Sequence, residues 1–255
     1  MSLKIFDLSG RTALVTGSSR GLGRAFAEGL AGAGAKVILN GLNSERLDAA
    51  SLKMREAGHD VLTSAFDVTE EAQVVAAFEA FDAGGIEVDI LVNNSGIQFR
   101  KPMLELETAD WKRVIDVNLT ACFVVGREAA RRMAKRGRGK IINIGSLTSE
   151  VARATIAPYA VSKGGIRMLT KEMAAEWGEL GIQANAIGPG YMVTDMNEAL
   201  MSNPEFDAWV KARTPMRRWG LPEELAGTVI YLASDASNYI TGQIIYADGG
   251  MISVL

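Results

Sequence analysis

Short runs of β-branched and other apolar residues alternate with longer helical patterns along the 255 residues of the chain. Most of the short runs are apolar throughout, which is typical of strands that are covered on both faces of a sheet. Strands that alternate with helices at this spacing predict a parallel sheet with right-handed crossovers. The expected strands span residues 12–15, 36–39, 61–65, 90–92, 140–144, 183–187 and 243–246.

The helical patterns between these runs each carry an apolar face. Two begin with recognisable signals, Thr69 as a capping hydroxyl before Glu70 and Glu71, and Pro222 as a first helical residue. No repeat, low-complexity segment or change of composition marks a linker, so we expect one domain over residues 1–255. The predicted fold class is α/β, a single-domain Rossmann-type doubly wound parallel sheet of about seven strands. The clearest apolar faces are Leu22, Ala25, Phe26, Gly29 and Leu30, and Val74, Val75, Phe78 and Phe81.

The charge balance argues against nucleic acid as a partner. The chain has 27 Lys and Arg against 30 Asp and Glu, a formal net charge of −3, whereas phosphate-backbone binding needs a clustered positive surface. One basic run stands out, and we interpret it as a solvated helix end, where cations suit the negative pole of the helix dipole. The run consists of Arg131, Arg132, Lys135, Arg136, Arg138 and Lys140.

Cysteine and histidine are too few to form a disulfide, a metal site or a histidine-based triad. Cys122 is the single cysteine and lies in an apolar stretch, which indicates a buried small hydrophobe. His59 is the single histidine and follows a glycine in a polar turn. No apolar run approaches membrane-spanning length, and the first ten residues lack a signal-peptide pattern, so we expect no membrane partner and a cytoplasmic location.

A glycine-rich turn follows the first expected strand and leads directly into the first helical pattern. Gly17, Gly21 and Gly23 allow a tight turn in which backbone N–H groups approach phosphate oxygens, and the helix start adds favourable partial charge. A glycine trio alone is weak evidence, but this position between strand and helix makes a nucleotide phosphate site the favoured interpretation.

Tyr159 and Lys163 stand four residues apart, and therefore on one face of a helix. A fixed positive charge near a phenol favours the phenolate, so this pair predicts an acid/base whose pKa is brought down from about 10 toward neutral pH. Ser146 follows the strand at residues 140–144, where it could donate a hydrogen bond to a developing alkoxide. Asn118 adds a polar side chain inside a helical pattern.

These motifs, in this order, resemble the short-chain dehydrogenase/reductase family. The resemblance rests on the T-G-x-x-x-G-x-G turn, on residues 93–96, on Asn118, Ser146, Tyr159 and Lys163, and on a Pro-Gly pair at residues 189–190, and it covers nearly the whole chain. It implies that Tyr159 is the acid/base, Lys163 tunes it and binds the nicotinamide ribose, Ser146 orients the substrate oxygen and Asn118 supports a water-linked proton relay.

The resemblance further implies a bound dinucleotide and an assembly, a homotetramer or a homodimer. Two positions depart from the family pattern: Ser95 replaces an alanine, and Gly188 replaces an alanine or asparagine, which we expect to loosen that loop. The implied cofactor contacts are Gly17, Ser19, Arg20, Gly21, Leu22, Gly23, Asn40, Asp67, Val68, Asn93, Ser95, Gly96, Tyr159, Lys163, Pro189, Gly190, Met192 and Thr194.

The second expected strand bears on the choice between NAD(H) and NADP(H). NAD-specific proteins usually place an acid after it to bind the ribose 2′-hydroxyl, but here no acid occurs before Glu45 and Gly41 occupies that place. Arg20 could pair with a 2′-phosphate, while Leu42 stands where many NADP-using relatives have an arginine. We expect NADP(H) to be preferred, with NAD(H) possible.

Three segments around the expected site are similar to those of gluconate 5-dehydrogenases within the family: residues 96–102, 146–153 and 213–220. This similarity implies reversible oxidation of D-gluconate to 5-keto-D-gluconate. Arg100, with Arg153 behind it, is suited to hold a carboxylate. The other predicted substrate contacts are Gln98, Ser146, Ser149, Glu150 and Tyr159.

Other interpretations stay open from the sequence. Glu150 could instead pair with Arg153 or Arg100 as scaffold. The reaction could be 3-oxoacyl-acyl-carrier-protein reduction, with the basic run docking an acidic carrier, or another sugar or polyol dehydrogenation. A nucleotide-binding module without turnover is disfavoured by the complete catalytic set. The segment at about residues 190–215 is expected to be a substrate loop or lid.

Overall fold

The computed structural model describes residues 3–254 and contains one seven-stranded sheet in which every pairing is parallel. The strand order is β3-β2-β1-β4-β5-β6-β7, so the predicted doubly wound sheet is confirmed. Each expected strand is present, and β2 and β6 extend beyond their predicted ends. The strands are β1 (Thr12–Val15), β2 (Lys36–Gly41), β3 (Val61–Ala65), β4 (Ile90–Asn93), β5 (Gly139–Ile144), β6 (Ile182–Pro189) and β7 (Ile244–Ala247).

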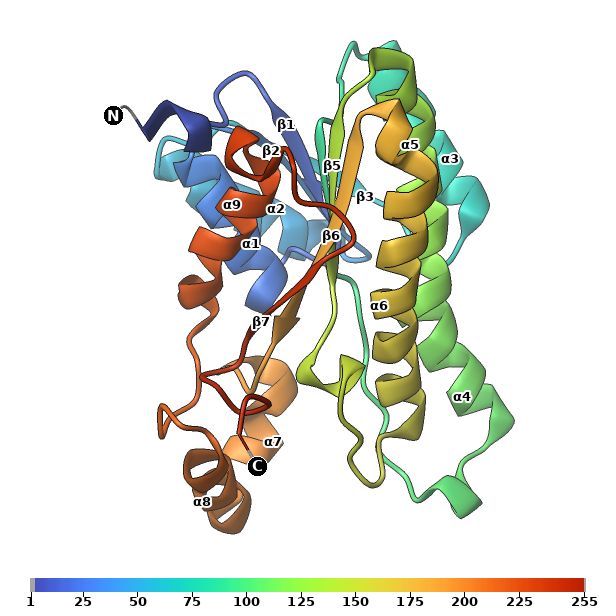
Figure 1. Ribbon diagram of the computed structural model, residues 1–255. Helices are drawn as coiled ribbons and strands as arrows, with labels where there is room; N and C mark the ends of the chain where they lie inside the picture. Colours follow the sequence, from blue (N-terminus) through green and yellow to red (C-terminus); the bar gives the residue numbers. More distant parts are fainter. Residues whose placement is uncertain (1–2, 255) are drawn as a thin grey trace.

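Helices cover both faces of the sheet, as Figure 1 shows. Helices α1, α2 and α9 pack on one face, and α3, α5 and α6 on the other, while α7 and α8 lie beyond the carboxyl ends of the strands. The helices are α1 (Gly21–Gly32), α2 (Ser44–Glu56), α3 (Glu71–Ala83), α4 (Thr108–Ile115), α5 (Ala121–Arg136), α6 (Ala157–Trp177), α7 (Glu198–Met201), α8 (Pro204–Arg213) and α9 (Ala226–Ala233).

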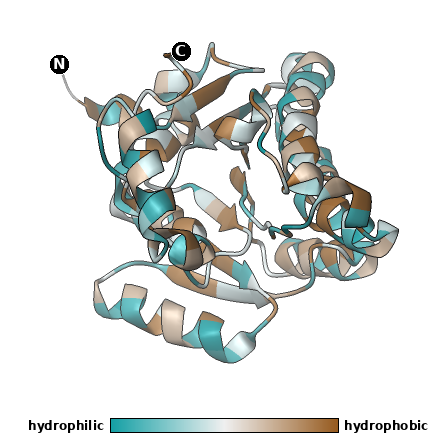
Figure 2. Ribbon diagram, turned by 90° about the horizontal axis from the view of Figure 1, so that it is seen from below, coloured by the Kyte–Doolittle hydropathy of each residue, from teal (hydrophilic) through white to brown (hydrophobic). Residues whose placement is uncertain are grey.

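Successive strand residues enter opposite halves of the core, which explains why the strands read as continuous apolar runs. In β1, Ala13 and Val15 pack toward α1 and α9, whereas Leu14 packs toward α5. Seen from below, hydrophobic strands lie between helices that carry hydrophilic residues on their outer sides (Figure 2). Phe26 and Phe78, both predicted core residues, are fully buried on the two faces.

The predicted helix starts have different outcomes. Pro222 is the first residue of a 3₁₀ turn, Pro222–Leu225, that leads into α9, as expected. Thr69 does not cap α3, because its hydroxyl donates to Asp67 Oδ1 at 2.7 Å and the helix begins two residues later. The capping prediction was therefore wrong: the hydroxyl closes a local turn around Asp67 instead.

The basic run is a solvated helix end only in part: Arg131, Lys135 and Arg138 are exposed near or after the end of α5, but most of its arginines are paired with acids and Lys140 is buried. Arg131 and Arg132 pair with Glu128, and Arg132 also pairs with Asp82 at 2.8 Å. Arg136 and Arg138 reach the acids at positions 87 and 89 in the loop before β4. Within the described residues 3–254, no helix is long and apolar enough to cross a membrane.

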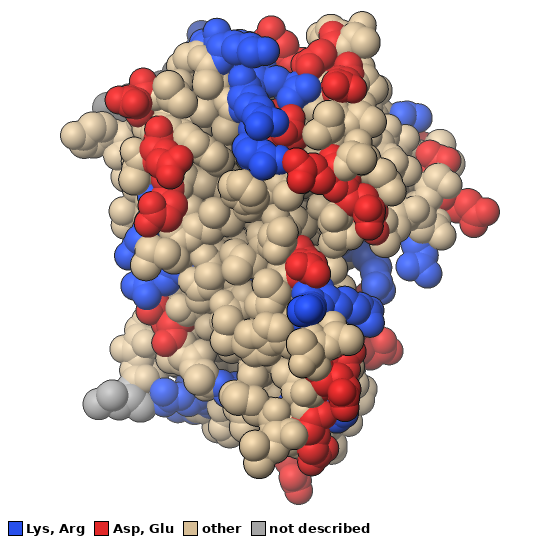
Figure 3. Space-filling model, turned by 90° about the vertical axis from the view of Figure 1, so that its right-hand side faces the viewer, with Lys and Arg blue, Asp and Glu red and all other residues tan. Residues whose placement is uncertain are grey.

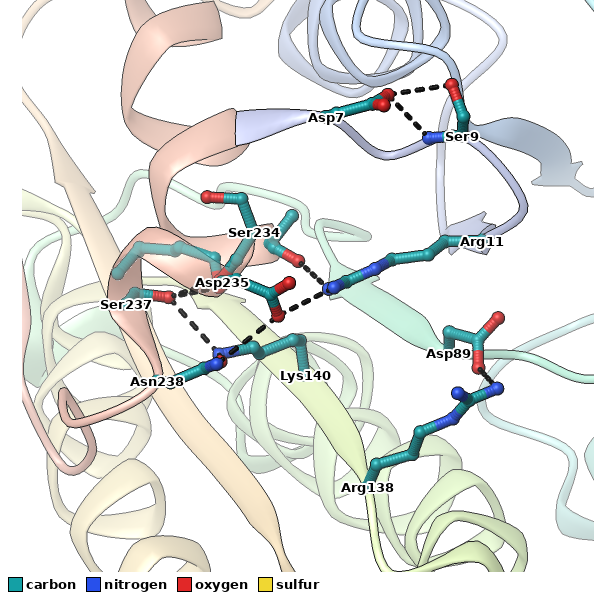
Figure 4. A network of polar contacts seen from close by, with 12 residues as sticks. Asp7, Ser9, Arg11, Asp89, Arg138, Lys140, Ser234, Asp235, Ser237 and Asn238 are labelled. Atoms are coloured by element: carbon teal, nitrogen blue, oxygen red, sulfur yellow. Dashed lines mark hydrogen bonds and ion pairs between the residues drawn. The ribbon is translucent and has the colours of Figure 1, made fainter. Parts of the chain in front are cut away.

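Lys140, the last member of the run, is 5% exposed and lies at the amino-terminal edge of the sheet. Its Nζ donates to Asn238 Oδ1 at 2.8 Å and to Ser237 Oγ at 3.4 Å, while the neighbouring Arg11 pairs with Asp235 (Figure 4). Burial, reinforced by the charge of Arg11 and opposed by that of Asp235, lowers the pKa of Lys140 to about 8.

This shift predicts a pH-dependent contribution to stability. The lysine pKa in an unfolded chain is about 10.4, so between about pH 8 and pH 10.4 the unfolded state holds the extra proton and the free energy of unfolding rises with pH. Lys140→Met removes that titration. The wild-type minus Lys140→Met difference in the free energy of unfolding should rise by about 1–2 kcal/mol over this interval, after allowance for solvent near the strand end. Urea unfolding at several pH values measures this difference. Parallel pH profiles for the wild type and Lys140→Met would contradict the prediction. Lys135→Met, which changes an exposed lysine, is the control.

Candidate active site

A cavity of about 870 Å³ opens at the carboxyl ends of the strands, where a doubly wound sheet binds its ligands. It is lined by the glycine-rich turn after β1, by the ends of β2 and β3, and by the loops after β4, β5 and β6. Most of the predicted cofactor contacts lie in this lining. They are Gly17, Ser19, Arg20, Gly21, Leu22, Gly23, Asn40, Asp67, Val68, Ser95, Gly96, Tyr159, Lys163, Pro189, Gly190, Met192 and Thr194.

The glycine-rich turn has the geometry of a phosphate site. Gly17 and Gly21 adopt φ of 61° and 56°, a conformation that favours glycine. A Cβ at Gly23 would lie 2.4 Å from the Gly17 carbonyl oxygen, so only glycine fits there. No side chain caps the start of α1, which leaves its first N–H groups directed at the cavity, where they suit an anion. These residues fit the diphosphate of a dinucleotide.

Asn40 and Asn94 hold the walls of this turn. Asn40 is 1% exposed; its Oδ1 accepts from Gly17 N at 3.4 Å, and its Nδ2 donates to two carbonyls near the end of β3. Asn94 Nδ2 donates to the carbonyls of Thr16 and Gly17 at 2.9 and 3.1 Å. Sequence reasoning passed over Asn94 because nothing in the motif distinguishes it from the asparagine before it.

Asn93 was predicted to contact the cofactor, but it does not line the cavity. Its side chain is buried beneath the cavity, where Nδ2 donates to Asn143 Oδ1 at 2.9 Å and to the Cys122 carbonyl at 3.3 Å. It therefore joins β4 to β5 and α5. The adjacent Ser95 and Gly96 do line the cavity.

Tyr159, Lys163 and Ser146 come together on one side of the cavity. Tyr159 and Lys163 lie on α6, with Lys163 Nζ 5.7 Å from the centre of the tyrosine ring. Lys163 is buried and donates to the Ile144 carbonyl at 2.6 Å, which ties α6 to the end of β5. Ser146 begins the turn after β5, and its hydroxyl hydrogen-bonds the phenol of Tyr159.

The acid/base character of Tyr159 differs from the sequence prediction. Burial raises the pKa of Tyr159 above its usual value of 10, and the Ser146 hydrogen bond and the charge of Arg100 lower it less. Burial also lowers the pKa of Lys163. The predicted net lowering of the tyrosine pKa is therefore not found in this structure: burial dominates, and the groups that lower the pKa are Ser146 and Arg100.

Asn118 is fully buried and lies behind the lining residues, within a π-helical turn (Asp116–Thr120) between α4 and α5. Its Oδ1 accepts from Ile97 N at 2.8 Å, and its Nδ2 donates to Ile97 O and to Ser162 Oγ at 2.9 and 3.1 Å. Ser162 in turn donates to the Tyr159 carbonyl at 2.7 Å. Asn118 thus couples the loop after β4 to the helix that carries the tyrosine; its part in a proton relay stays a prediction.

The substrate end of the cavity contains Gln98, Arg100 and Arg153. Arg100 donates to Gln98 Oε1 at 3.2 Å. Arg153 donates to the hydroxyl of Tyr191 at 3.2 Å, and its guanidinium lies 4.4 Å from the ring centre of Phe206 on α8. Burial and the charge of Arg153 lower the pKa of Arg100, while Tyr191 and Tyr159 raise it by less. Arg100 is therefore close enough to Tyr159 and to Arg153 for their charges to interact.

Two predicted substrate contacts are wrong. Ser149 is buried, and its hydroxyl donates to the Lys163 carbonyl at 2.8 Å, so it fixes the turn against α6. Glu150 pairs with Arg167 at 3.0 Å and accepts from the hydroxyl of Tyr246 at 2.9 Å. It faces α6 and β7, away from the cavity lining, and it also does not form the scaffold pair with Arg153 or Arg100 that the sequence left open.

We expected Gly188 to loosen its loop, but the structure gives this glycine a packing role instead. A Cβ at this position would lie 2.4 Å from Cδ1 of Tyr246, so the missing side chain makes room for the tyrosine ring. Because the same tyrosine holds Glu150, the small residue at 188 lets β7 anchor the segment that carries Ser146 and Arg153.

The segment at residues 190–215 forms a 3₁₀ turn (Asp195–Asn197) followed by α7 and α8. Tyr191, Phe206, Trp209 and Trp219 pack their rings together, with centroids 5.3–6.4 Å apart. Asp195 pairs with Arg20 of the glycine-rich turn at 2.9 Å, across the cavity mouth. The lid role of this segment stays a prediction.

The cavity lining also includes residues outside the predicted set of site residues. Arg46, near the start of α2, faces the same end as Arg20, and Arg113 of α4 lines the substrate end. Neither residue directly follows a strand, and we looked for site residues just after the carboxyl ends of strands, so we did not identify them from the sequence. Other such residues are Gly41, Leu42, Asn43, Phe66, Thr69, Ile97, Val117, Leu147, Thr148, Ile156, Tyr191, Asp195, Met196, Asn197 and Leu200.

A dinucleotide site beside a tyrosine and a lysine on one helix defines an oxidoreductase that moves hydride between a nicotinamide and a carbonyl carbon. A family model described as enoyl-(acyl carrier protein) reductase matches residues 17–252. The chain belongs to the short-chain dehydrogenase/reductase family and is an NAD(P)-dependent enzyme.

Within this family, the chain is similar to three proteins described as gluconate dehydrogenases. A gluconate 5-dehydrogenase of Gluconobacter oxydans is 47% identical over 247 residues, covering 97% of this chain and 96% of the relative. The crystal structure of a gluconate 5-dehydrogenase from Burkholderia cenocepacia, with NADP and tartrate, is 48% identical over 100% of both chains, with a TM-score of 0.98. A candidate gluconate dehydrogenase from Agrobacterium tumefaciens is 68% identical, covers 98% of this chain and 99% of its own, and has a TM-score of 0.98.

Proposed function

We propose that this enzyme catalyses the reversible oxidation of D-gluconate at C5 to 5-keto-D-gluconate with NADP(H). The observation that carries the proposal is the Arg100 guanidinium, which lies near Tyr159 in the same cavity and has no carboxylate partner among residues 3–254. A small hydroxylated carboxylate meets this arrangement, because arginine binds carboxylates in a bidentate manner. The tartrate in the Burkholderia cenocepacia enzyme, itself a hydroxylated carboxylate, supports this substrate class.

The roles follow from the geometry. When bound, the nicotinamide supplies or accepts the hydride. In the reductive direction the Tyr159 hydroxyl gives a proton to the substrate oxygen, and Ser146 donates a hydrogen bond to the same oxygen. Lys163 supplies positive charge beneath the tyrosine, where it stabilises the phenolate that remains. Arg100 and Gln98 hold the polar chain of the substrate.

The charge at the adenosine end of the cavity favours NADP(H) over NAD(H). Arg20 and Arg46 line the cavity beside the end of β2, where residues 40–43 include no acid. A 2′-phosphate would pair with them, whereas the exposed ion pair of Arg20 with Asp195 is weak competition. The Burkholderia cenocepacia enzyme with bound NADP supports this choice.

We therefore expect kcat/KM to favour NADP over NAD by about tenfold or more. Arg20→Ser and Arg46→Ser should each lower the value for NADP and leave that for NAD nearly unchanged, because NAD lacks the phosphate. Steady-state kinetics with both cofactors measures this, with Arg138→Ser, at the opposite edge of the sheet, as the control. A tenfold preference of the wild type for NAD would contradict the proposal.

Reduction of 3-oxoacyl carrier proteins is less favoured. That reading needs the basic run to dock an acidic carrier, but Arg131, Arg132, Arg136 and Arg138 already pair with acids of this chain. NADPH consumption with 5-keto-D-gluconate and with an acetoacetyl thioester separates the two functions. Saturable turnover of the keto acid and a much slower reaction of the thioester are expected; the reverse order would overturn the proposal.

We also propose a homotetramer or homodimer built on α5 and α6. Phe123, Val161 and Met168 of these helices are 40%, 51% and 56% exposed, and Figure 3 shows a broad uncharged area on the molecular side that carries these helices. Burial of this surface against another copy would remove it from water. The cytoplasmic location stays a prediction from the sequence.

A further inference from the structure

Three guanidiniums line the substrate end of the cavity, those of Arg100, Arg113 and Arg153. Within the described residues 3–254, none of the three has a carboxylate within ion-pair distance. The acids that line the cavity are Asp67 and Asp195, and Asp195 pairs with Arg20 at the cofactor end. The substrate end of the cavity therefore carries positive charge that no nearby carboxylate neutralises.

Two of these arginines are already held in place by neutral partners. Arg153 is stacked on Phe206 at 4.4 Å and bonded to the Tyr191 hydroxyl at 3.2 Å, while Arg100 is bonded to Gln98 at 3.2 Å. A guanidinium has five N–H donors, so each keeps donors for a ligand. The two cations also act on each other, because Arg153 lowers the pKa of Arg100.

Glu150, the acid nearest in sequence that could neutralise Arg153, is directed elsewhere. It pairs with Arg167 of α6 at 3.0 Å and accepts from Tyr246 of β7 at 2.9 Å. The monocarboxylate of the proposed function would neutralise one of these three guanidiniums, so Arg113 and either Arg100 or Arg153 would still face the cavity without a counter-ion. Placing like charges together in a partly desolvated site is unfavourable unless a ligand compensates them.

We propose that the enzyme also oxidises sugar diacids, with one carboxylate bound by Arg100 and the second by Arg153. This inference rests on the proposed function, since it uses the same cavity, tyrosine and cofactor. Carboxylates are favoured as both anions because each arginine offers one planar fork, which matches a carboxylate in a bidentate pair.

The reaction balances as the oxidation of a secondary alcohol. The C–H bond at the carbinol carbon breaks, and its electron pair leaves with the hydrogen as hydride to NADP⁺, which is reduced to NADPH. The O–H bond of the substrate breaks, its proton passes to the phenolate form of Tyr159, and its electron pair forms the C=O bond. The diacid becomes a keto-diacid.

The test compares D-gluconate with D-glucarate, the diacid with the same carbon skeleton, as substrates with NADP⁺. The wild type should show a higher kcat/KM for D-glucarate by about tenfold or more. Arg153→Met should lower kcat/KM for D-glucarate by about 30-fold or more and that for D-gluconate by less than about fivefold. Arg153→Lys, which keeps the charge, should restore part of the diacid activity, and Arg138→Met, a distant exposed cation, should change neither substrate.

The outcomes separate this inference from the proposed function. Turnover of D-gluconate without turnover of, or competitive inhibition by, D-glucarate overturns the inference and leaves the proposed function intact. Turnover of D-glucarate without D-gluconate supports the inference and contradicts the proposed function. An equal loss for both substrates in Arg153→Met overturns the inference, because it assigns Arg153 to the support of α8. A preference for 6-phosphogluconate over D-glucarate overturns the choice of a second carboxylate.

Discussion

Replacing Tyr159 with phenylalanine is expected to lower kcat by about 10²–10⁴-fold while the affinity for the cofactor stays nearly unchanged. The variant loses only the phenol oxygen, the atom that Ser146 bonds and that we expect to exchange a proton with substrate. Its ring still fills the space beside Lys163. Stopped-flow or steady-state assays give kcat, and fluorescence titration gives the cofactor Kd.

Tyr239 provides a matched control for this change, because its side chain is fully exposed. Tyr239→Phe removes the same atom without touching the cavity, and it should keep wild-type activity. If Tyr159→Phe retained more than about a tenth of wild-type kcat, the assignment of the tyrosine as acid/base would be wrong.

Gly23→Ala is expected to weaken binding of NADP(H) by about 30-fold or more, since the phosphate contacts at the helix start depend on backbone position. The added Cβ would lie 2.4 Å from Gly17 O, 2.5 Å from Asn94 Nδ2 and 2.9 Å from Ser18 Cα. Relief of these contacts displaces the turn and the asparagine that holds it. Isothermal titration of NADPH measures the change in Kd.

The same helix supplies the control. A Cβ at Gly32, the last residue of α1, meets no atom within 4 Å, so Gly32→Ala should bind NADPH as the wild type does. Wild-type affinity in a folded Gly23→Ala variant would contradict the assignment of this turn to the phosphates.

The fold was predictable because its signals are local. Most of the strands are short apolar runs separated by helical patterns, and strands buried on both faces have such sequences. The carboxyl-end rule then placed Ser146 and the glycine-rich turn at the cavity, since both directly follow a strand.

Side-chain direction is what the sequence could not supply. Ser149 and Glu150 stand in the same segment as Ser146 and Arg153, yet they bond to α6 and β7. Asn93 likewise turns beneath the sheet edge while Ser95 reaches the cavity. Which residue of a loop faces a ligand depends on partners distant in sequence, and such partners leave no local signal.

Electrostatic predictions failed for a related reason. The i and i+4 spacing places Tyr159 and Lys163 together on α6, but the sequence could not show how deeply each side chain is buried, and burial raises the tyrosine pKa and lowers the lysine pKa. Burial also explains the failed prediction for Lys140. From the sequence we placed this lysine in a solvated basic run, but its side chain is buried in the structure.

The most direct test of the central claim is the reaction of the wild-type enzyme with D-gluconate and NADP⁺, followed by nicotinamide absorbance and by NMR of the product. We expect saturable formation of NADPH and a product oxidised at C5, and reduction of 5-keto-D-gluconate in reverse. No turnover of either compound, together with efficient turnover of a different ketone, would keep the family assignment and contradict the proposed role of Arg100 in binding a sugar acid.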